Sequence, residues 1–158
     1  MSKASEDIQR ISESLSDIVW NINPRYDQLD TLFVRMKRYA ADMFDGKNIG
    51  SRFEFPETES GIQLSMTQRR DLYLIFKEAV NNLVKYSGAT EALVKLTTDN
   101  HQLQLIITDN GKGFDRTSLR AGNGLHNMEQ RAAAAGGSLN IRSVPGEGTR
   151  VELELKLS

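Results

Sequence analysis

The stretch Thr67-Gln-Arg-Arg-Asp-Leu-Tyr-Leu-Ile-Phe-Lys-Glu-Ala-Val-Asn-Asn-Leu-Val-Lys-Tyr86 decides the fold of this chain, because it predicts a long amphipathic helix. Thr67 can cap the start of this helix, and Ser87-Gly88 ends it. Two successive asparagines, Asn81 and Asn82, lower the helix propensity and need another explanation. The apolar residues recur at helical spacing and predict one buried stripe: Leu72, Ile75, Phe76, Ala79 and Leu83.

The segments on both sides of this helix predict a sheet covered by helices. Residues 29–43 carry apolar side chains at helical spacing, and residues 50–55 alternate as a strand does. Downstream, a helix is expected from Asn123 or Gly124 to about Ala135, and strands are expected at 91–98, 102–108, 138–144 and 149–157. This order indicates an α+β fold, a two-layer sandwich with helices on one face of a mixed, mostly antiparallel sheet.

The first residues form a separate pattern. Ile8, Ile11, Leu15, Ile18 and Ile22 follow heptad spacing, and Asn23-Pro24 interrupts it. Two interpretations stay open: an ordinary core helix, or a helix of a dimeric bundle. We therefore expect a division into an N-terminal helix with its linker, residues 1–24, and a main domain, residues 25–158.

Composition excludes several classes of protein. The 158 residues suffice for one domain, and 39% hydrophobic with 26% charged residues is typical of globular chains. A net charge of −1 gives no electrostatic case for binding nucleic acid or an anionic membrane. Cysteine is absent, and no apolar run approaches the length of a membrane span or a signal core. We expect a cytoplasmic domain, and a fragment cut from a membrane protein would have the same composition.

Polar residues on the long helix indicate a site. Glu78 and Asn82 are four residues apart and share one face, which Lys85 continues. A solvated helix face is the simpler interpretation. The alternative is that the Asn82 amide oxygen binds Mg²⁺, which takes few protein ligands besides phosphate and water. Glu78 would then orient a water or accept a proton, and Lys85 would meet phosphate as a point charge.

Three glycine-containing segments follow. Asp109-Asn-Gly-Lys-Gly113 comes after a strand and is either a hairpin turn or a place where the backbone at Gly111 and Gly113 approaches a flat ligand. Asp109 can accept a hydrogen bond from an exocyclic amine such as that of adenine. Gly122-Asn-Gly124 leads into a helix and is either a loop with an ordinary N-cap or a place where helix amides hold phosphate. Gly148-Thr149 begins the last strand and is either part of an ordinary turn or a place where Thr149 supplies a hydroxyl.

Together these segments resemble the boxes of the GHKL nucleotide-binding superfamily, over about residues 27 to 158. Glu78-x-x-x-Asn82 resembles the N box, and the next two glycine segments resemble the two glycine boxes. The segment Gly124-Leu-His-Asn-Met128 is similar to the corresponding segment of the sensor histidine kinases that are paired with LuxR-type response regulators. The resemblance implies ATP and Mg²⁺ as cofactors and Asn82 on the metal. It implies contacts to the nucleotide from Lys85, Tyr86, Asp109, Gly111, Gly113, Gly122, Gly124, Leu125 and Thr149.

The resemblance further implies that Glu78 assists phosphoryl transfer to a histidine on a bundle helix. Tyr86 departs from the family, because many of these kinases have histidine there. His101 and His126 fall inside the nucleotide domain and do not fit the acceptor role. We therefore expect a fragment that binds ATP and lacks the acceptor. Expected partners are the rest of the kinase, a LuxR-type response regulator and, as an open question, a second copy through the N-terminal helix.

Two other functions stay open at this point. The first is a serine kinase of the anti-sigma-factor type, which shares the fold and acts on a partner protein. The second is a non-catalytic interaction module gated by nucleotide.

Overall fold

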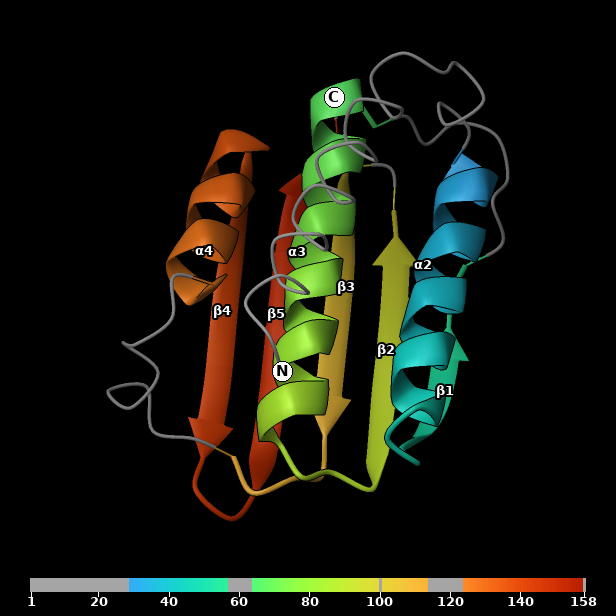
Figure 1. Ribbon diagram of the computed structural model, residues 1–158. Helices are drawn as coiled ribbons and strands as arrows, with labels where there is room; N and C mark the ends of the chain where they lie inside the picture. The colour runs from blue at the N-terminus through green and yellow to red at the C-terminus, as the bar shows by residue number, and fades with distance from the viewer. Residues whose placement is uncertain (1–28, 57–63, 100, 114–123, 158) are drawn as a thin grey trace, which may run out of the picture.

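Helices cover one face of a five-stranded sheet in the computed structural model, which describes residues 29–56, 64–99, 101–113 and 124–157 (Figure 1). The predicted α+β two-layer fold is confirmed. Within the described ranges no helix has the length and apolarity needed to cross a membrane. The predicted helix over 8–22 and the glycine at Gly122 lie outside the described residues. The elements are α2 (Leu29–Asp45), β1 (Gly50–Glu54), α3 (Met66–Tyr86), β2 (Glu91–Thr98), β3 (Gln102–Asp109), α4 (Gly124–Ala134), β4 (Gly137–Val144) and β5 (Gly148–Lys156).

The sheet has the strand order β1-β2-β3-β5-β4. β1 and β2 are parallel, which requires a crossover, and α3 lies in that connection. The other neighbouring pairs are antiparallel, so that β5 lies between β3 and β4. In Figure 1, α4 lies in front of β4, α3 in front of the middle of the sheet, and α2 in front of β2 and β1.

The core lies between the helices and the sheet. Alternate residues of β3 point into it, as the predicted alternation requires, and Leu103, Leu105 and Ile107 are buried. The predicted stripe of α3 is also confirmed, since all five of its apolar residues are buried. The buried side chains of α2 complete the layer: Leu32, Phe33, Met36, Ala40 and Phe44.

Ser65, rather than Thr67, caps the start of α3, so the predicted cap was wrong. The Ser65 hydroxyl accepts a hydrogen bond from the Gln68 backbone N–H at 3.1 Å, and the Gln68 side chain accepts one from the Ser65 N–H at 3.1 Å. The Gln68 amide also donates to the carbonyls of Ala135 at 3.1 Å and Lys156 at 2.8 Å. These distant partners hold Gln68, and with it the capping box, in place. The predicted end at Ser87 is confirmed.

Asn81 joins α3 to α2. Its side-chain oxygen accepts a hydrogen bond of 2.6 Å from the Tyr39 hydroxyl. A hydrogen bond of this kind contributes about 1 kcal/mol to stability, which offsets the cost of asparagine inside a helix. One of the two successive asparagines therefore has a structural explanation, and Asn82 does not share it.

Candidate functional site

A cleft lies where the C-terminal end of α3 meets α4 and the sheet. Its empty volume is about 580 Å³, counting the space open to solvent, which falls in the range of small-molecule sites. Most of its wall is apolar and comes from α3, α4 and strands β3 to β5. Six residues predicted from the sequence as site residues line it: Asn82, Tyr86, Asp109, Gly113, Leu125 and Thr149.

The topology explains why these residues meet. The end of α3, the end of β3 and the start of β5 lie at the same end of the molecule, at the bottom of Figure 1, and α4 begins about midway along β4 and runs away from that end. Asp109 closes β3 and is paired across the sheet with Thr149, which follows the first residue of β5. Residues 40 positions apart thus become neighbours through strand register alone.

Asp109 is a half-buried carboxylate in this cleft. Its oxygen accepts a hydrogen bond from the Gly111 N–H at 2.8 Å. Burial raises the pKa of Asp109 above its ordinary value, and hydrogen bonds from the backbone of Gly111 and Thr149 oppose that rise. The Thr149 hydroxyl lies 2.9 Å from the Ser143 hydroxyl, and either of the two can donate. The cleft therefore presents a carboxylate acceptor and a hydroxyl on adjacent strands.

Asn110-Gly111 does not form the hairpin turn that its sequence favours, so that alternative was wrong. The Asn110 side-chain oxygen accepts hydrogen bonds from the backbone N–H groups of Thr90 at 3.0 Å and Glu91 at 2.9 Å. The Asn110 amide also donates to the Thr90 hydroxyl at 2.9 Å. These bonds join the end of β3 to the start of β2 and turn the chain away from the sheet.

Gly111 and Gly113 allow two close backbone approaches. A Cβ atom at Gly111 would lie 2.3 Å from the Ser87 carbonyl oxygen, which accepts the Lys112 N–H at 2.8 Å. A Cβ atom at Gly113, where φ is +66°, would lie 2.2 Å from the Val144 carbonyl oxygen. Both glycines therefore approach the protein's own backbone. Gly113 also lines the cleft, so a contact from it to a ligand stays a prediction.

Glu78 lies in a second, polar cleft between α3 and α4. This cleft has an empty volume of about 540 Å³ and shares Met128 with the first. Its polar and charged lining includes Lys77, Glu78 and Arg131. Lys85 is exposed in the last turn of α3 and lines neither cleft. The structure thus brings Asn82 to the apolar cleft, Glu78 to its polar neighbour, and Lys85 to the surface nearby.

The donor set fits a magnesium ion that is held mainly by phosphate and water. Among the described residues, no three acidic, histidine or cysteine side chains are grouped to hold a metal by themselves. Asn82 offers one hard amide oxygen at the cleft, and Glu78 offers a carboxylate one turn earlier on the same face. Mg²⁺ keeps several waters and takes one or two protein ligands beside nucleotide phosphates.

The histidines lie where the sequence predicts them. His101 is exposed beside the turn between β2 and β3, and His126 is exposed in the first turn of α4. Ser143 was missed as a residue of the site. The strands expected at 138–144 and 149–157 contained the signal, because a tight turn between them places Ser143 opposite Thr149, as the register shows.

The fold and the cleft together define a nucleotide-binding domain of the α+β class. The model of the histidine kinase-, DNA gyrase B- and HSP90-like ATPase family matches residues 67–158, and the chain belongs to this family. The matched region includes α3 from its second residue onward, both clefts and every described residue of the predicted site.

Individual relatives include a sensor histidine kinase and a sensor protein. The chain is 38% identical over 87 residues to the sensor histidine kinase LiaS of Bacillus subtilis, covering 54% of this chain and 24% of LiaS. It is 39% identical over 88 residues to the sensor protein VraS of Staphylococcus aureus, covering 55% and 25%. The chain thus spans about a quarter of the length of these relatives. The blue-light activated histidine kinase EL346 of Erythrobacter litoralis has the same fold, with a TM-score of 0.74 and 16% identity over 100% of this chain and 52% of that one.

Proposed function

We propose that this chain contains the ATP-binding catalytic domain of a two-component sensor histidine kinase. The observation that carries the proposal is the pairing of Asp109 with Thr149 inside the apolar cleft. A desolvated carboxylate beside a hydroxyl suits a flat heterocycle with an exocyclic amine, and adenine is such a ring. Family membership and sequence identity to two sensor kinases support the same function.

The adenine ring would lie between the apolar walls of the cleft. Asp109 would accept a hydrogen bond from the exocyclic amine, and Thr149 would supply the second polar contact. Gly113 and Leu125 would border the ring, because both line the cleft with these two residues. The Gly111 N–H orients the Asp109 carboxylate, so Gly111 would act on the nucleotide through that hydrogen bond.

The phosphates would extend toward the C-terminal end of α3 and the start of α4. Asn82 would hold Mg²⁺, which neutralises charge on the phosphates when it is bound. Lys85 and Tyr86 would meet phosphate or ribose from the last turn of α3. The helix start at Gly124, with Gly122 before it, would offer backbone N–H groups to the phosphate tail.

The proposed reaction moves the γ-phosphoryl group to a histidine on a bundle helix. An imidazole nitrogen forms a bond to the γ-phosphorus, the bond from that phosphorus to the bridging oxygen breaks, and ADP leaves. Such transfers depend mainly on positioning and charge neutralisation. Glu78 lies in the polar cleft next to the nucleotide cleft and would accept the imidazole proton.

The proposed partners follow from this reaction. The acceptor histidine would belong to a dimerisation and phosphotransfer bundle, to which residues 1–24 would contribute a helix and a homodimer contact. A LuxR-type response regulator would receive the phosphoryl group from that histidine. We propose a cytoplasmic site of action, where ATP is available, and no role for nucleic acid or membrane contact in this segment.

Calorimetry of ATP binding with and without Mg²⁺ tests the nucleotide site. The wild-type chain should bind ATP more tightly with Mg²⁺, and Asn82→Ala should lose this metal dependence. The neighbouring Asn81→Ala is the matched control, because Asn81 hydrogen-bonds to Tyr39 and should retain the metal dependence. Equal metal dependence in Asn82→Ala and the wild type would reject the role of Asn82. A wild-type chain that binds no nucleotide would reject the proposed function.

Labelled ATP tests the reaction itself. The chain should transfer the label to a separate bundle fragment that contains the acceptor histidine, and the product should be acid-labile, as phosphohistidine is. Glu78→Gln should slow this transfer while leaving ATP affinity nearly unchanged. Acid-stable label on a serine would instead support the serine kinase, and ATP binding without any transfer would support the interaction module.

A further inference from the structure

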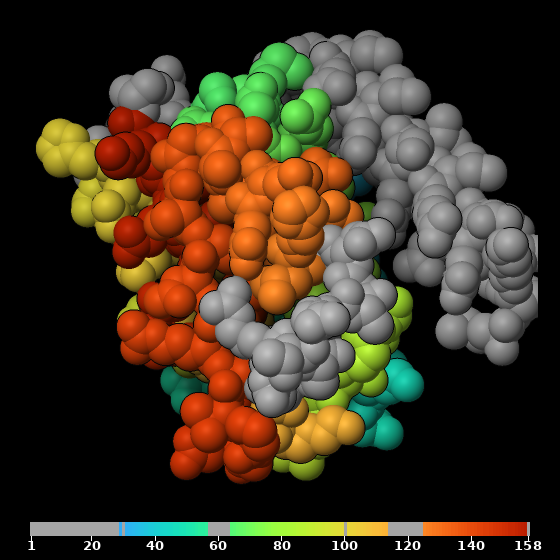
Figure 2. Space-filling view, turned by 90° about the vertical axis from the view of Figure 1, so that its left-hand side faces the viewer, coloured from blue at the N-terminus to red at the C-terminus, as the bar shows by residue number. Residues whose placement is uncertain are grey.

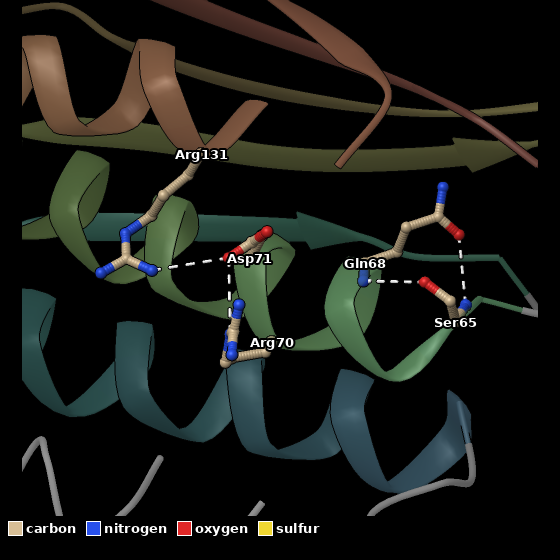
Figure 3. A network of polar contacts seen from close by, with 5 residues as sticks. All are labelled: Ser65, Gln68, Arg70, Asp71 and Arg131. Carbon is tan, nitrogen blue, oxygen red and sulfur yellow. Dashed lines mark hydrogen bonds and ion pairs between the residues drawn. The ribbon is translucent and has the colours of Figure 1, made fainter. Parts of the chain in front are cut away.

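Asp71 is a buried carboxylate outside the nucleotide cleft. It lies in the first half of α3, and only 2% of its surface is exposed. Its Oδ1 atom lies 3.5 Å from Nη1 of Arg131 on α4 and 3.6 Å from Nε of Arg70 on α3. Figure 3 shows Arg131 reaching across from α4 to Asp71. Burying an unpaired charge costs free energy, and a buried ion pair does not always regain that cost. The presence of this pair therefore calls for an explanation.

The pair joins the far end of α4 to α3. Arg131 lies in the last turn of α4, and Gln68 donates to the Ala135 carbonyl just beyond that helix at 3.1 Å. Leu125 and Met128, nearer the start of α4, line the nucleotide cleft instead. Figure 2 shows α4, in orange, with the redder β4 to its left and the green start of α3 above it. One end of α4 is therefore fixed by polar contacts, and the other end forms part of the cleft wall.

We propose that Asp71 is a positioning residue for the nucleotide cleft, which acts through its ion pair with Arg131. The pair fixes where α4 lies along α3 and so fixes Leu125 and Met128 in the cleft wall. This inference rests on the proposed function, because it assigns Asp71 a role in nucleotide affinity. Asp71 itself does not line the nucleotide cleft.

The sign of the effect separates positioning from direct electrostatics. Removing the Asp71 carboxylate removes a negative charge from a protein that binds a polyanion, and Coulomb's law alone then strengthens nucleotide binding. Loss of positioning weakens it. Asp71→Asn keeps the size of the side chain while it removes the charge, so the direction of the change in affinity identifies the cause.

The experiment measures the affinity of the whole chain for a non-hydrolysable ATP analogue with Mg²⁺. Asp71→Asn should weaken binding about fivefold or more, the lower range of coupling between sites. Arg131→Lys keeps the positive charge but loses the planar guanidinium group, and it should also weaken binding of the analogue. The Arg131 side chain is 41% exposed, so we expect this variant to fold even if Asp71→Asn does not. Arg52→Lys is the control, because Arg52 pairs with Glu54 on the exposed edge strand.

Two further measurements test the positioning role. In the double variant, the two effects should not add, because both remove the same pair. Hydrogen exchange should show faster exchange of α4 amides in both single variants than in Arg52→Lys. Variants that unfold more easily yet bind the analogue as the wild type does would show a merely structural pair and overturn the proposal. A wild-type chain that binds no nucleotide would instead overturn the proposed function.

Discussion

Gly111→Ala tests how the end of β3 is held against α3. A Cβ atom at this position would lie 2.3 Å from the Ser87 carbonyl oxygen and 2.8 Å from both the carbonyl carbon and the Cβ atom of Ser87. The Ser87 backbone has little freedom to move away, since its N–H donates to the Leu83 carbonyl at 3.1 Å and its carbonyl accepts from Lys112 at 2.8 Å. One of these backbone segments must shift to admit the methyl group.

The expected loss of stability follows from that shift. Inserting a methyl group into a closely packed site costs about 1–3 kcal/mol, and losing the bond between Lys112 and Ser87 adds about 1 kcal/mol. Gly111→Ala should therefore lower the free energy of unfolding by about 2–4 kcal/mol, a large part of the roughly 5–15 kcal/mol typical of a domain. Nucleotide affinity should fall as well, because the Gly111 N–H orients the Asp109 carboxylate.

Denaturation by urea measures this loss, with Gly50→Ala as the matched control. A Cβ atom at Gly50 would lie 3.6 Å from the Thr90 carbonyl oxygen and 3.9 Å from the Glu91 side chain, which are ordinary contacts. This control should stay within about 0.5 kcal/mol of the wild type. A Gly111→Ala variant as stable as Gly50→Ala would refute the close approach of the first glycine box to α3.

Two further predictions concern the neighbours of Gly111. Asn110→Ala should lower the free energy of unfolding by about 1–2 kcal/mol, because it removes three hydrogen bonds between an exposed side chain and Thr90 and Glu91. Asn110→Asp can keep the two hydrogen bonds that Asn110 accepts, so its free energy of unfolding should fall less in the same urea titration. Asp109→Asn should raise stability at neutral pH, because burial raises the pKa of Asp109 and stability is lost as pH rises through that folded-state pKa. The gain in stability should disappear at pH values below the ordinary pKa of 3.8, which thermal unfolding measured against pH would show. ATP affinity at neutral pH should fall about tenfold or more, which calorimetry would measure. A destabilised Asp109→Asn variant at pH 7 would contradict the burial argument.

Local sequence patterns predicted the elements well, because each element has one apolar face. The predicted helix over 67–86 begins one residue earlier in the structure, and the predicted strands over 91–98 and 102–108 match β2 and β3 within one residue. The two-layer arrangement followed from the order of these elements. Local pattern does not specify the order of strands in the sheet. β5 pairs with β3, although α4 and β4 lie between these two strands in the sequence.

The errors share a physical cause, which is a polar side chain with a distant partner. The Asn-Gly pair at 110–111 favours a hairpin locally, yet the Asn110 side chain accepts hydrogen bonds from the backbone N–H groups of Thr90 and Glu91, and no hairpin forms. Ser65 caps α3 because Gln68 is held by carbonyls 67 and 88 positions away. Asp71, which the sequence pattern did not single out, is buried, and its charged partner Arg131 lies 60 positions away on α4. None of these partners can be identified from spacing along the chain.

Asn81 and Asn82 are adjacent on α3 but lie in different surroundings. Successive residues point about 100° apart, so Asn81 meets Tyr39 of α2 while Asn82 lines the nucleotide cleft. Among the described residues, no side-chain hydrogen bond holds Asn82. Alanine is the better helix former by about 0.5 kcal/mol, so Asn82→Ala should not destabilise the free protein, whereas Asn81→Ala should cost about 1 kcal/mol. The absence of a stabilising hydrogen bond to the Asn82 side chain within the described residues is consistent with the proposed role of Asn82 in holding Mg²⁺ with the nucleotide.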